Sequence, residues 1–141
     1  MRIYYAHPIS DYGTTHEQVV QRSISLMLPA FIGGYEPWVV NPNEPLHQKG
    51  YEERGMDHFM DVIDGCDGCV FDSFPGGIIG SGVAMEVKRF LDQGKPVWGV
   101  VGAFCGYGFQ RISDLPAFVA TRETTREMSR LYRAMPNGGR R

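Results

Sequence analysis

The chain lacks several features that would assign it to a special class of protein. It has no apolar run near the ~20 residues of a membrane-spanning helix, so we expect no membrane partner. Its first ten residues lack a basic start followed by a long apolar core, which predicts no secretory signal. Three cysteines, an odd number, exclude a disulfide-stapled miniprotein and fit free thiols in a reducing compartment. The expected location is therefore cytoplasmic.

No charge of one sign dominates the 141 residues, whose formal net charge is −2. The segment 121–141 nevertheless holds six arginines and two glutamates, a net charge of +4, which leaves −6 on the preceding residues. An acidic body argues against a nucleic-acid partner. One side of the last predicted helix carries four arginines: Arg122, Arg126, Arg130 and Arg133. They form a solvated face, a subunit interface or a rim that attracts phosphate.

The composition, 43% hydrophobic and 21% charged, is ordinary for one globular domain, which we place at residues 1–136. Residues 137–141 are expected to be a flexible basic tail. Apolar patterns predict strands at 2–6, 37–41, 68–71, 97–101 and 117–120, and helices at 14–31, 56–64, 83–93 and 123–135. Segments 43–54 and 103–115 are expected to be loops.

The alternation of strand and helix indicates the fold class. The strands are continuously apolar, which is typical of strands buried on both faces of a sheet. The pattern therefore predicts an α/β fold, a small Rossmann-like (flavodoxin-like) domain with a parallel sheet of about five strands and helices on both faces. Ligands of such folds bind outside the carboxyl ends of the strands.

A glycine-dense turn, residues 73–82, leads from a predicted strand into a predicted helix. It lacks the lysine of a P-loop and the full dinucleotide fingerprint. Backbone amides at a helix N-terminus can still approach a ligand closely, so we expect Gly80, Ser81 and Gly82 to bind a phosphate or sugar oxygen.

Glu86 lies in the first turns of that helix, at the edge of its apolar stripe. Helical geometry therefore predicts a half-buried carboxylate that faces the strand ends. Partial burial limits hydration and would strengthen Glu86 as a nucleophile or base. The alternative is a glutamate that only complements the helix dipole.

Three further residues are candidates for binding because of their place in the predicted sheet. His7 follows the first strand and could bind a sugar hydroxyl or a 5′-phosphate, or stabilise a turn. Tyr5 lines the same pocket or belongs to the core, and Asn41 ends the second strand and binds ligand or caps the loop. Cys66 and Cys69 lack the further ligands of a zinc site, so no metal is expected.

Five short segments occur in an order and at intervals that match a known family. They are Ile3-Tyr-Tyr-Ala-His-Pro8, Val39-Val-Asn-Pro42, Cys66-Asp-Gly-Cys-Val70, Gly82-Val-Ala-Met-Glu86 and Gly94-Lys-Pro-Val97. Together they make residues 2–101 resemble the nucleoside 2-deoxyribosyltransferase family, which includes nucleotide N-glycosidases. The resemblance implies that Glu86 attacks the anomeric carbon of a 2-deoxyribosyl group, displaces the nucleobase and forms a sugar ester that a second base or water resolves. It also implies no cofactor and a homodimer or larger homo-oligomer.

The chain departs from the family pattern at two positions. Family transferases often carry an aspartate six residues before the nucleophile, where this chain has Gly80. The family also has an aspartate on the preceding helix that orients the nucleophile. Asp61 or Asp57 is expected in that role, although neither has the family's spacing, and both also fit a solvated helix face. A non-catalytic nucleotide-binding sensor of the same fold is the alternative function.

Overall fold

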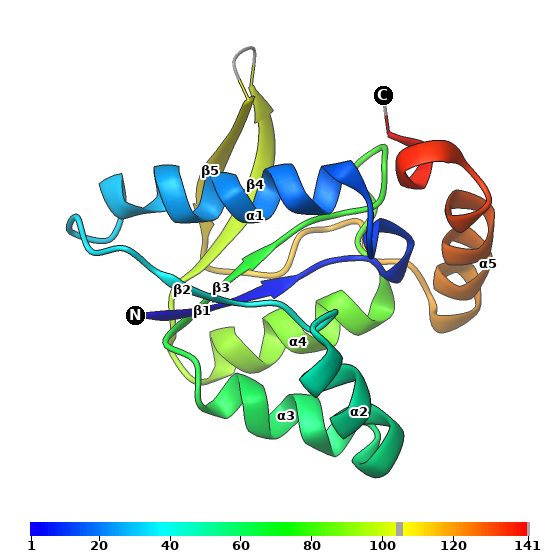
Figure 1. The fold of residues 1–141 in the computed structure, drawn as a ribbon, viewed down its shortest axis with the longest axis horizontal. Coiled ribbons are helices and arrows are strands. Elements are labelled where there is room, and N and C mark those ends of the chain that lie inside the picture. The colour runs from blue at the N-terminus through cyan, green and yellow to red at the C-terminus, as the bar shows by residue number, and fades with distance from the viewer. Residues whose placement is uncertain (104–105, 141) are drawn as a thin grey trace.

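One five-stranded sheet organises the chain in the computed structural model, which describes residues 1–103 and 106–140 (Figure 1). The strand order is β2-β1-β3-β4-β5. The strands are β1 (Arg2–Ala6), β2 (Trp38–Val40), β3 (Gly68–Phe71), β4 (Val97–Ala103) and β5 (Gly106–Ile112). The first four are parallel, and β5 pairs antiparallel with β4. The predicted α/β class and sheet of five strands are confirmed, with an antiparallel edge strand as the difference.

In the described ranges, five α-helices and three short 3-10 helices surround the sheet. They are α1 (Thr15–Met27), α2 (Pro45–Arg54), α3 (Met56–Asp64), α4 (Ser81–Asp92), α5 (Arg122–Arg133), η1 (Ile9–Asp11), η2 (Leu28–Ala30) and η3 (Pro136–Gly139). Helix α1 covers one face of the sheet, whereas α3 and α4 cover the other (Figure 1). The direction of the β1-to-β2 connection is opposite to that of the β3-to-β4 connection, and right-handed crossovers then place α1 and α4 on opposite faces.

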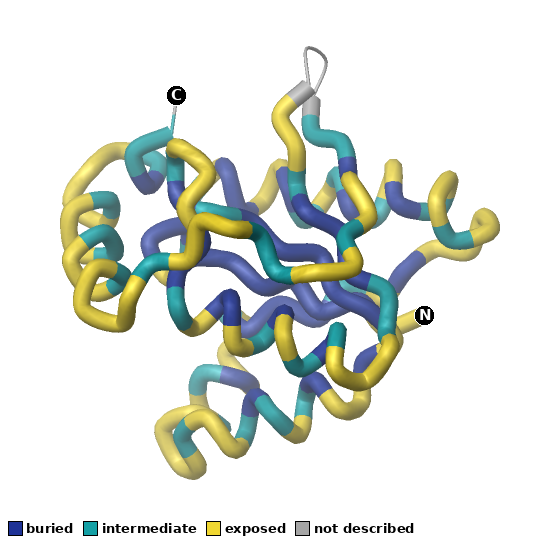
Figure 2. Tube along the Cα trace, turned by 180° about the vertical axis from the view of Figure 1, so that it is seen from behind, coloured by how far each residue is buried: buried dark blue, intermediate teal, exposed yellow. Residues whose placement is uncertain are grey.

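Alternate residues of the central strands pack into two separate hydrophobic cores, one on each face of the sheet. Ile3, Tyr5 and Val70 pack on the α1 side, and Tyr4 and Cys69 pack on the α3 and α4 side. Side chains in a strand point to opposite faces in turn, so neighbouring residues of β1 enter different cores. Figure 2 shows the result: the buried trace, dark blue, runs through the central strands.

Both segments that were expected to be loops, 43–54 and 103–115, contain regular structure. Residues 45–54, expected to be irregular, form α2, with Pro45 in the first turn where its missing N–H costs no helix hydrogen bond. Gly55, at φ +64°, ends that helix. Strand β5 lies within segment 103–115. The strand predicted at 117–120 is reduced to one isolated bridge between Ile79 and Val119.

The C-terminal region differs most from the sequence-based expectation. Helix α5 has no buried residue, and it stands across the carboxyl end of the sheet (Figure 1). The expected flexible tail is instead folded back: Pro136 to Gly139 form η3, and Arg140 pairs with Asp11. Arg141 lies outside the described residues. Within the described part of the chain, no helix has the length and apolar character that crossing a bilayer requires.

Candidate functional site

A cavity of about 200 Å³ opens at the carboxyl ends of β1 and β3. Its walls come from β1, the β1–α1 turn, the segments that follow β2 and β3, and helices α2, α3, α4 and α5. The lining residues are Tyr4, His7, Pro8, Ile9, Tyr12, Pro42, Gln48, Tyr51, Met56, Phe59, Phe74, Gly80, Gly82, Val83, Glu86, Thr125 and Ser129. Aromatic and apolar side chains dominate, with a few polar groups among them, which is the usual make-up of a small-molecule site.

Glu86 supplies the one carboxylate among the described residues that line this cavity. It lies on α4, and its side chain is half-buried, as its place at the edge of the helix stripe predicted. Burial raises the pKa of Glu86 to about 7, and a hydrogen bond from Tyr4 partly offsets that rise. Close to neutral pH this carboxyl group is therefore divided between its neutral and ionised forms.

Tyr4 donates a short hydrogen bond from its hydroxyl to Oε2 of Glu86. Tyr4 reaches Glu86 because it projects from the face of β1 that α4 covers, where its ring packs on Phe90 with centroids 5.9 Å apart. Burial and the charge of Glu86 raise the pKa of Tyr4, so the hydroxyl keeps its proton and acts as a donor. No hydrogen bond to Oε1 is present among the described residues, which leaves that oxygen for a ligand.

His7 lies on the cavity wall directly after β1 and is buried. Its Nδ1 donates to the carbonyl oxygen of Tyr5 at 2.9 Å, and its Nε2 lies 2.7 Å from a carboxylate oxygen of Glu17. Both ring nitrogens of His7 thus face oxygen atoms that accept hydrogen bonds. Burial alone would raise the pKa of Glu17, but hydrogen bonds, first from His7, hold it below its ordinary value.

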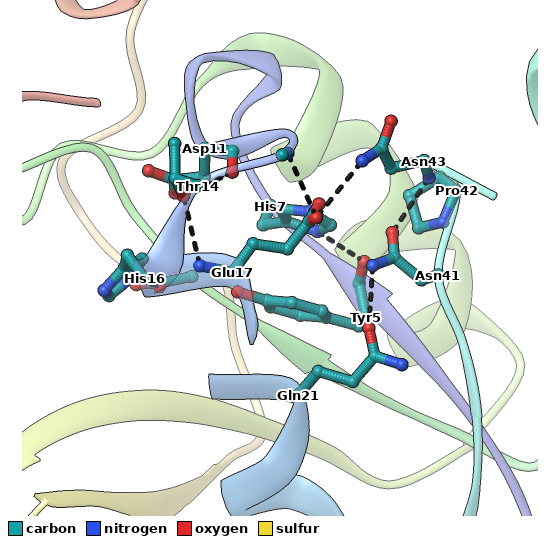
Figure 3. A network of polar contacts seen from close by, with 12 residues as sticks. Tyr5, His7, Asp11, Thr14, His16, Glu17, Gln21, Asn41, Pro42 and Asn43 are labelled. Carbon is teal, nitrogen blue, oxygen red and sulfur yellow. Dashed lines mark hydrogen bonds and ion pairs between the residues drawn. The ribbon is translucent and has the colours of Figure 1, made fainter. Parts of the chain in front are cut away.

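Glu17 ties together the loops beside the cavity (Figure 3). One of its oxygens accepts from the Gly13 amide and from Asn43 Nδ2, each at 3.1 Å. Thr14 Oγ1 caps α1 by accepting from the Glu17 amide, but the Glu17 side chain turns to Gly13 and His7 rather than back to Thr14. The Glu17 network thus holds the end of β1 against the β2–α2 loop.

The structure brings four of the predicted site residues to the cavity: Glu86, His7, Gly80 and Gly82. Three others lie elsewhere. Tyr5 belongs to the core on the α1 side, Asn41 is buried and donates to Gln21 at 2.8 Å, and the Ser81 amide donates to Thr125 Oγ1 at 2.9 Å. Ser81 is therefore engaged by α5, and the free amides of the α4 N-terminus are fewer than expected.

Neither aspartate that was expected to orient Glu86 does so. Asp61 is exposed and pairs with Arg54 at 2.5 Å, and Asp57 is also exposed. Neither lines the cavity or hydrogen-bonds Glu86. Both instead belong to the solvated face of α3, and the hydrogen bond to Glu86 comes from Tyr4.

Several cavity residues were missed because their elements were assigned differently. Gln48 and Tyr51 come from α2, which was expected to be a loop, and Thr125 and Ser129 come from α5, for which only the arginines were considered as site residues. Tyr4 was missed because the sequence does not tell which face of β1 meets α4. The signal that could have identified Tyr4 is the alternation of β1 combined with the handedness of the crossovers.

A second, more polar pocket of about 450 Å³ adjoins the first. The two share Ile9, Tyr12 and Gln48 in their walls. The remaining lining residues are Ser10, Thr14, Asn43, Arg133, Met135, Asn137 and Gly138. Arg133 is the one charged side chain among them.

One cluster of three potential metal ligands exists among the described residues: Asp11, His16 and Asp72. Its ligand atoms are already paired. His16 contacts Tyr107 at 2.9 Å and Asp72 at 2.6 Å, and Arg140 occupies both oxygens of Asp11. The arrangement is that of a buried ion network, with an arginine where a cation would otherwise bind.

Comparison with protein-family models, with curated proteins and with solved structures found no match for this chain. The chemistry of the site therefore rests on its own residues.

Proposed function

We propose that the protein cleaves or transfers the N-glycosidic bond of a 2′-deoxynucleoside or its 5′-monophosphate. Glu86 acts as the nucleophile, and the intermediate is a covalent deoxyribosyl ester. The observation that carries the proposal is a half-buried glutamate that faces an aromatic cavity, with Oε2 held by Tyr4 and Oε1 free among the described contacts.

The cavity fits this chemistry in three ways. Its aromatic walls, including Tyr12, Tyr51 and Phe74, can stack on a planar base and exclude water. The hydroxyl groups of Thr125 and Ser129 can hydrogen-bond its polar edge. A carboxylate beside the anomeric carbon stabilises the positive charge that develops as the base departs.

The reaction is balanced with one molecule of water. Glu86 Oε1 bonds to the anomeric carbon as the carbon–nitrogen bond breaks, and the electron pair leaves with the base. The base takes a proton from water, and the resulting hydroxide opens the ester and restores the Glu86 carboxylate. In transfer, the nitrogen of a second base opens the ester instead and gives its N–H proton to the hydroxide, which restores the water molecule, so water and base compete for one intermediate.

A panel of deoxynucleosides and their 5′-monophosphates, with base release followed by chromatography, tests the proposal. We expect turnover of at least one member by the wild-type chain and a loss of about 1,000-fold or more in Glu86→Gln. Glu86→Gln should still bind the same compound, as measured by calorimetry. Turnover that survives in Glu86→Gln would refute the nucleophile.

A non-catalytic nucleotide-binding module is the second candidate, favoured by one observation. Both ring nitrogens of His7 are engaged by Tyr5 and Glu17, and Gly80 has no side chain. Apart from Glu86, no described residue on the cavity wall therefore offers a carboxyl group or a free imidazole to protonate the departing base. Binding of the panel without base release by the wild-type chain would favour this sensor function.

A further inference from the structure

The residues Pro136 to Arg140, here called the strap, follow α5 and return to the β1–α1 turn. Asn137, Gly138 and Gly139 all have positive φ, at 52°, 63° and 79°, and these angles turn the chain back. A Cβ at Gly138 would lie 2.8 Å from the carbonyl oxygen of Ser10. Glycine is therefore required where the strap lies on η1, both for its backbone conformation and for space.

Arg140 ends the strap in a buried acidic site. Its Nε and Nη2 donate to the two oxygens of Asp11 at 3.0 and 2.9 Å, a bidentate pair. Nη2 also donates to the carbonyl oxygen of Ser73 and lies 3.8 Å from Asp72. The Asp11 side chain is 0% exposed and that of Arg140 is 14% exposed. One guanidinium thus links η1 to the chain that leaves β3.

A second contact ties the strap to α1. The side-chain oxygen of Asn137 accepts from the backbone amide of His16 at 2.9 Å, in the first turn of that helix. The strap therefore touches all three segments around the turn: η1, the end of β3 and the start of α1. The turn itself supplies Ile9 and Tyr12 to both pockets.

We propose that Arg140 is a positioning residue for the ligand pockets, which acts by holding the β1–α1 turn in place through Asp11. Without the guanidinium, the Asp11 carboxylate would be a buried charge that lacks its arginine partner. Removing one partner of a buried pair is strongly destabilising, and the turn relieves that cost by opening to water. Loss of Arg140 therefore loosens the shared wall of both pockets while the sheet stays folded.

Hydrogen exchange of single amides tests the proposal. The Tyr12 amide is bonded to the Ile9 carbonyl and the His16 amide to Asn137, so both report the docked strap. In Arg140→Ala we expect both amides to exchange about 100-fold faster or more, with the amides of β3 unchanged. Arg22→Ala, which removes an exposed arginine from α1, is the matched control and should leave both amides protected.

Two rescues separate a specific role from general destabilisation. Asp11→Asn combined with Arg140→Ala removes the orphaned charge and should restore much of the protection. Added guanidinium chloride at millimolar concentration should restore protection in Arg140→Ala but not affect Arg22→Ala. Unchanged exchange in Arg140→Ala, equal acceleration in β3, or failure of both rescues would overturn the proposal.

A kinetic measurement extends the test, and this arm alone rests on the proposed function. On the compound that the wild-type chain turns over, Arg140→Ala should raise KM about 10-fold or more and leave kcat within a few-fold, because Glu86 and Tyr4 are untouched. A fall in kcat with KM unchanged would contradict a positioning role. If the wild-type chain turns over nothing, the exchange experiment still decides the proposal.

Discussion

The carboxyl group of Glu86 lies where loss of hydration makes its ionised form unfavourable. Burial raises its pKa from 4.5 to about 7, so folding favours the protonated form. A group whose pKa is raised by folding stabilises the protein below its unfolded pKa and loses that contribution as pH rises through the folded value. Between about pH 4.5 and pH 7, the wild-type chain therefore loses stability at this residue.

Glu86→Gln removes that cost. We predict that the variant is more stable than the wild-type chain at pH 8, by roughly 1–3 kcal/mol, and equally stable near pH 4. Urea unfolding at the two pH values measures the difference. A variant that is less stable at pH 8 would show that the buried charge is compensated by contacts beyond Tyr4.

Tyr4 tunes the same carboxyl group, because its hydrogen bond lowers the pKa that burial raises. If ionised Glu86 is the nucleophile, kcat/KM of the wild-type chain rises with pH through about 7. Tyr4→Phe should move that midpoint to higher pH and lower activity more at pH 6 than at pH 9. A profile whose midpoint stays fixed would remove Tyr4 from this role.

At the residue scale, the sequence predicted Glu86 and His7 but not their partners. Helix periodicity locates Glu86 at the edge of an apolar stripe without reference to other elements. The choice between Tyr4 and Tyr5 depends on which face of β1 meets α4, which is a property of the assembled sheet. Asp61 and Asp57 failed as partners because i, i+4 spacing on α3 equally describes a solvated face.

At the scale of elements, α2 packs against α3 at a point where only glycine fits. A Cβ at Gly50 would lie 2.3 Å from the ring of His58, which in turn contacts His47 at 3.1 Å. Gly50→Ala should therefore push α2 from α3 and lower stability by about 1–3 kcal/mol. Because α2 carries Gln48 and Tyr51 into the cavity, KM should rise as well.

Gly82→Ala is the control for the free energy of unfolding, because a Cβ there meets nothing within 4 Å. Gly82 is the second residue of α4, so alanine there should leave stability unchanged or raise it by less than about 1 kcal/mol. Urea unfolding of both variants measures these changes. Equal changes in the free energy of unfolding for Gly50→Ala and Gly82→Ala would show that close packing of Gly50 against His58 does not determine the loss of stability.

The helices that bury an apolar stripe were predicted well, whereas α2, which lacks one, was predicted to be a loop. Helices α1, α3 and α4 bury one face and show the spacing of their apolar residues. Helix α2 has only His47 as a buried residue, so its polar sequence resembles a loop. Pro45 at its start and Gly55 at its end are residue types that favour helix boundaries. The low apolar content of the segment nevertheless led to the prediction of a loop.

On the scale of the whole molecule, the β1–α1 turn and the C-terminal region meet around the ligand pockets. The β1–α1 turn and α5 form the wall of the polar pocket, where Arg133 supplies a positive charge. Arg133→Ala should raise KM for a deoxynucleoside monophosphate about 10-fold and leave KM for the matching nucleoside unchanged. Arg130→Ala, exposed on the same helix, is the control.

Salt dependence checks this prediction independently. If Arg133 attracts phosphate, KM for the monophosphate should increase with ionic strength in the wild-type chain and depend less on salt in Arg133→Ala. Equal losses for nucleoside and monophosphate would place Arg133 outside phosphate recognition. Sequence patterns predicted neither the second pocket nor the strap, because both arise where the C-terminal region packs on the β1–α1 turn.

The central claim is that Glu86 forms a bond to the sugar, and mass spectrometry of a trapped intermediate tests it most directly. The chain is mixed with a substrate from the panel, quenched in acid and digested. The account predicts a peptide containing Glu86 with the added mass of a deoxyribosyl group, and no such adduct in Glu86→Gln. Base release with the adduct on another residue would contradict it.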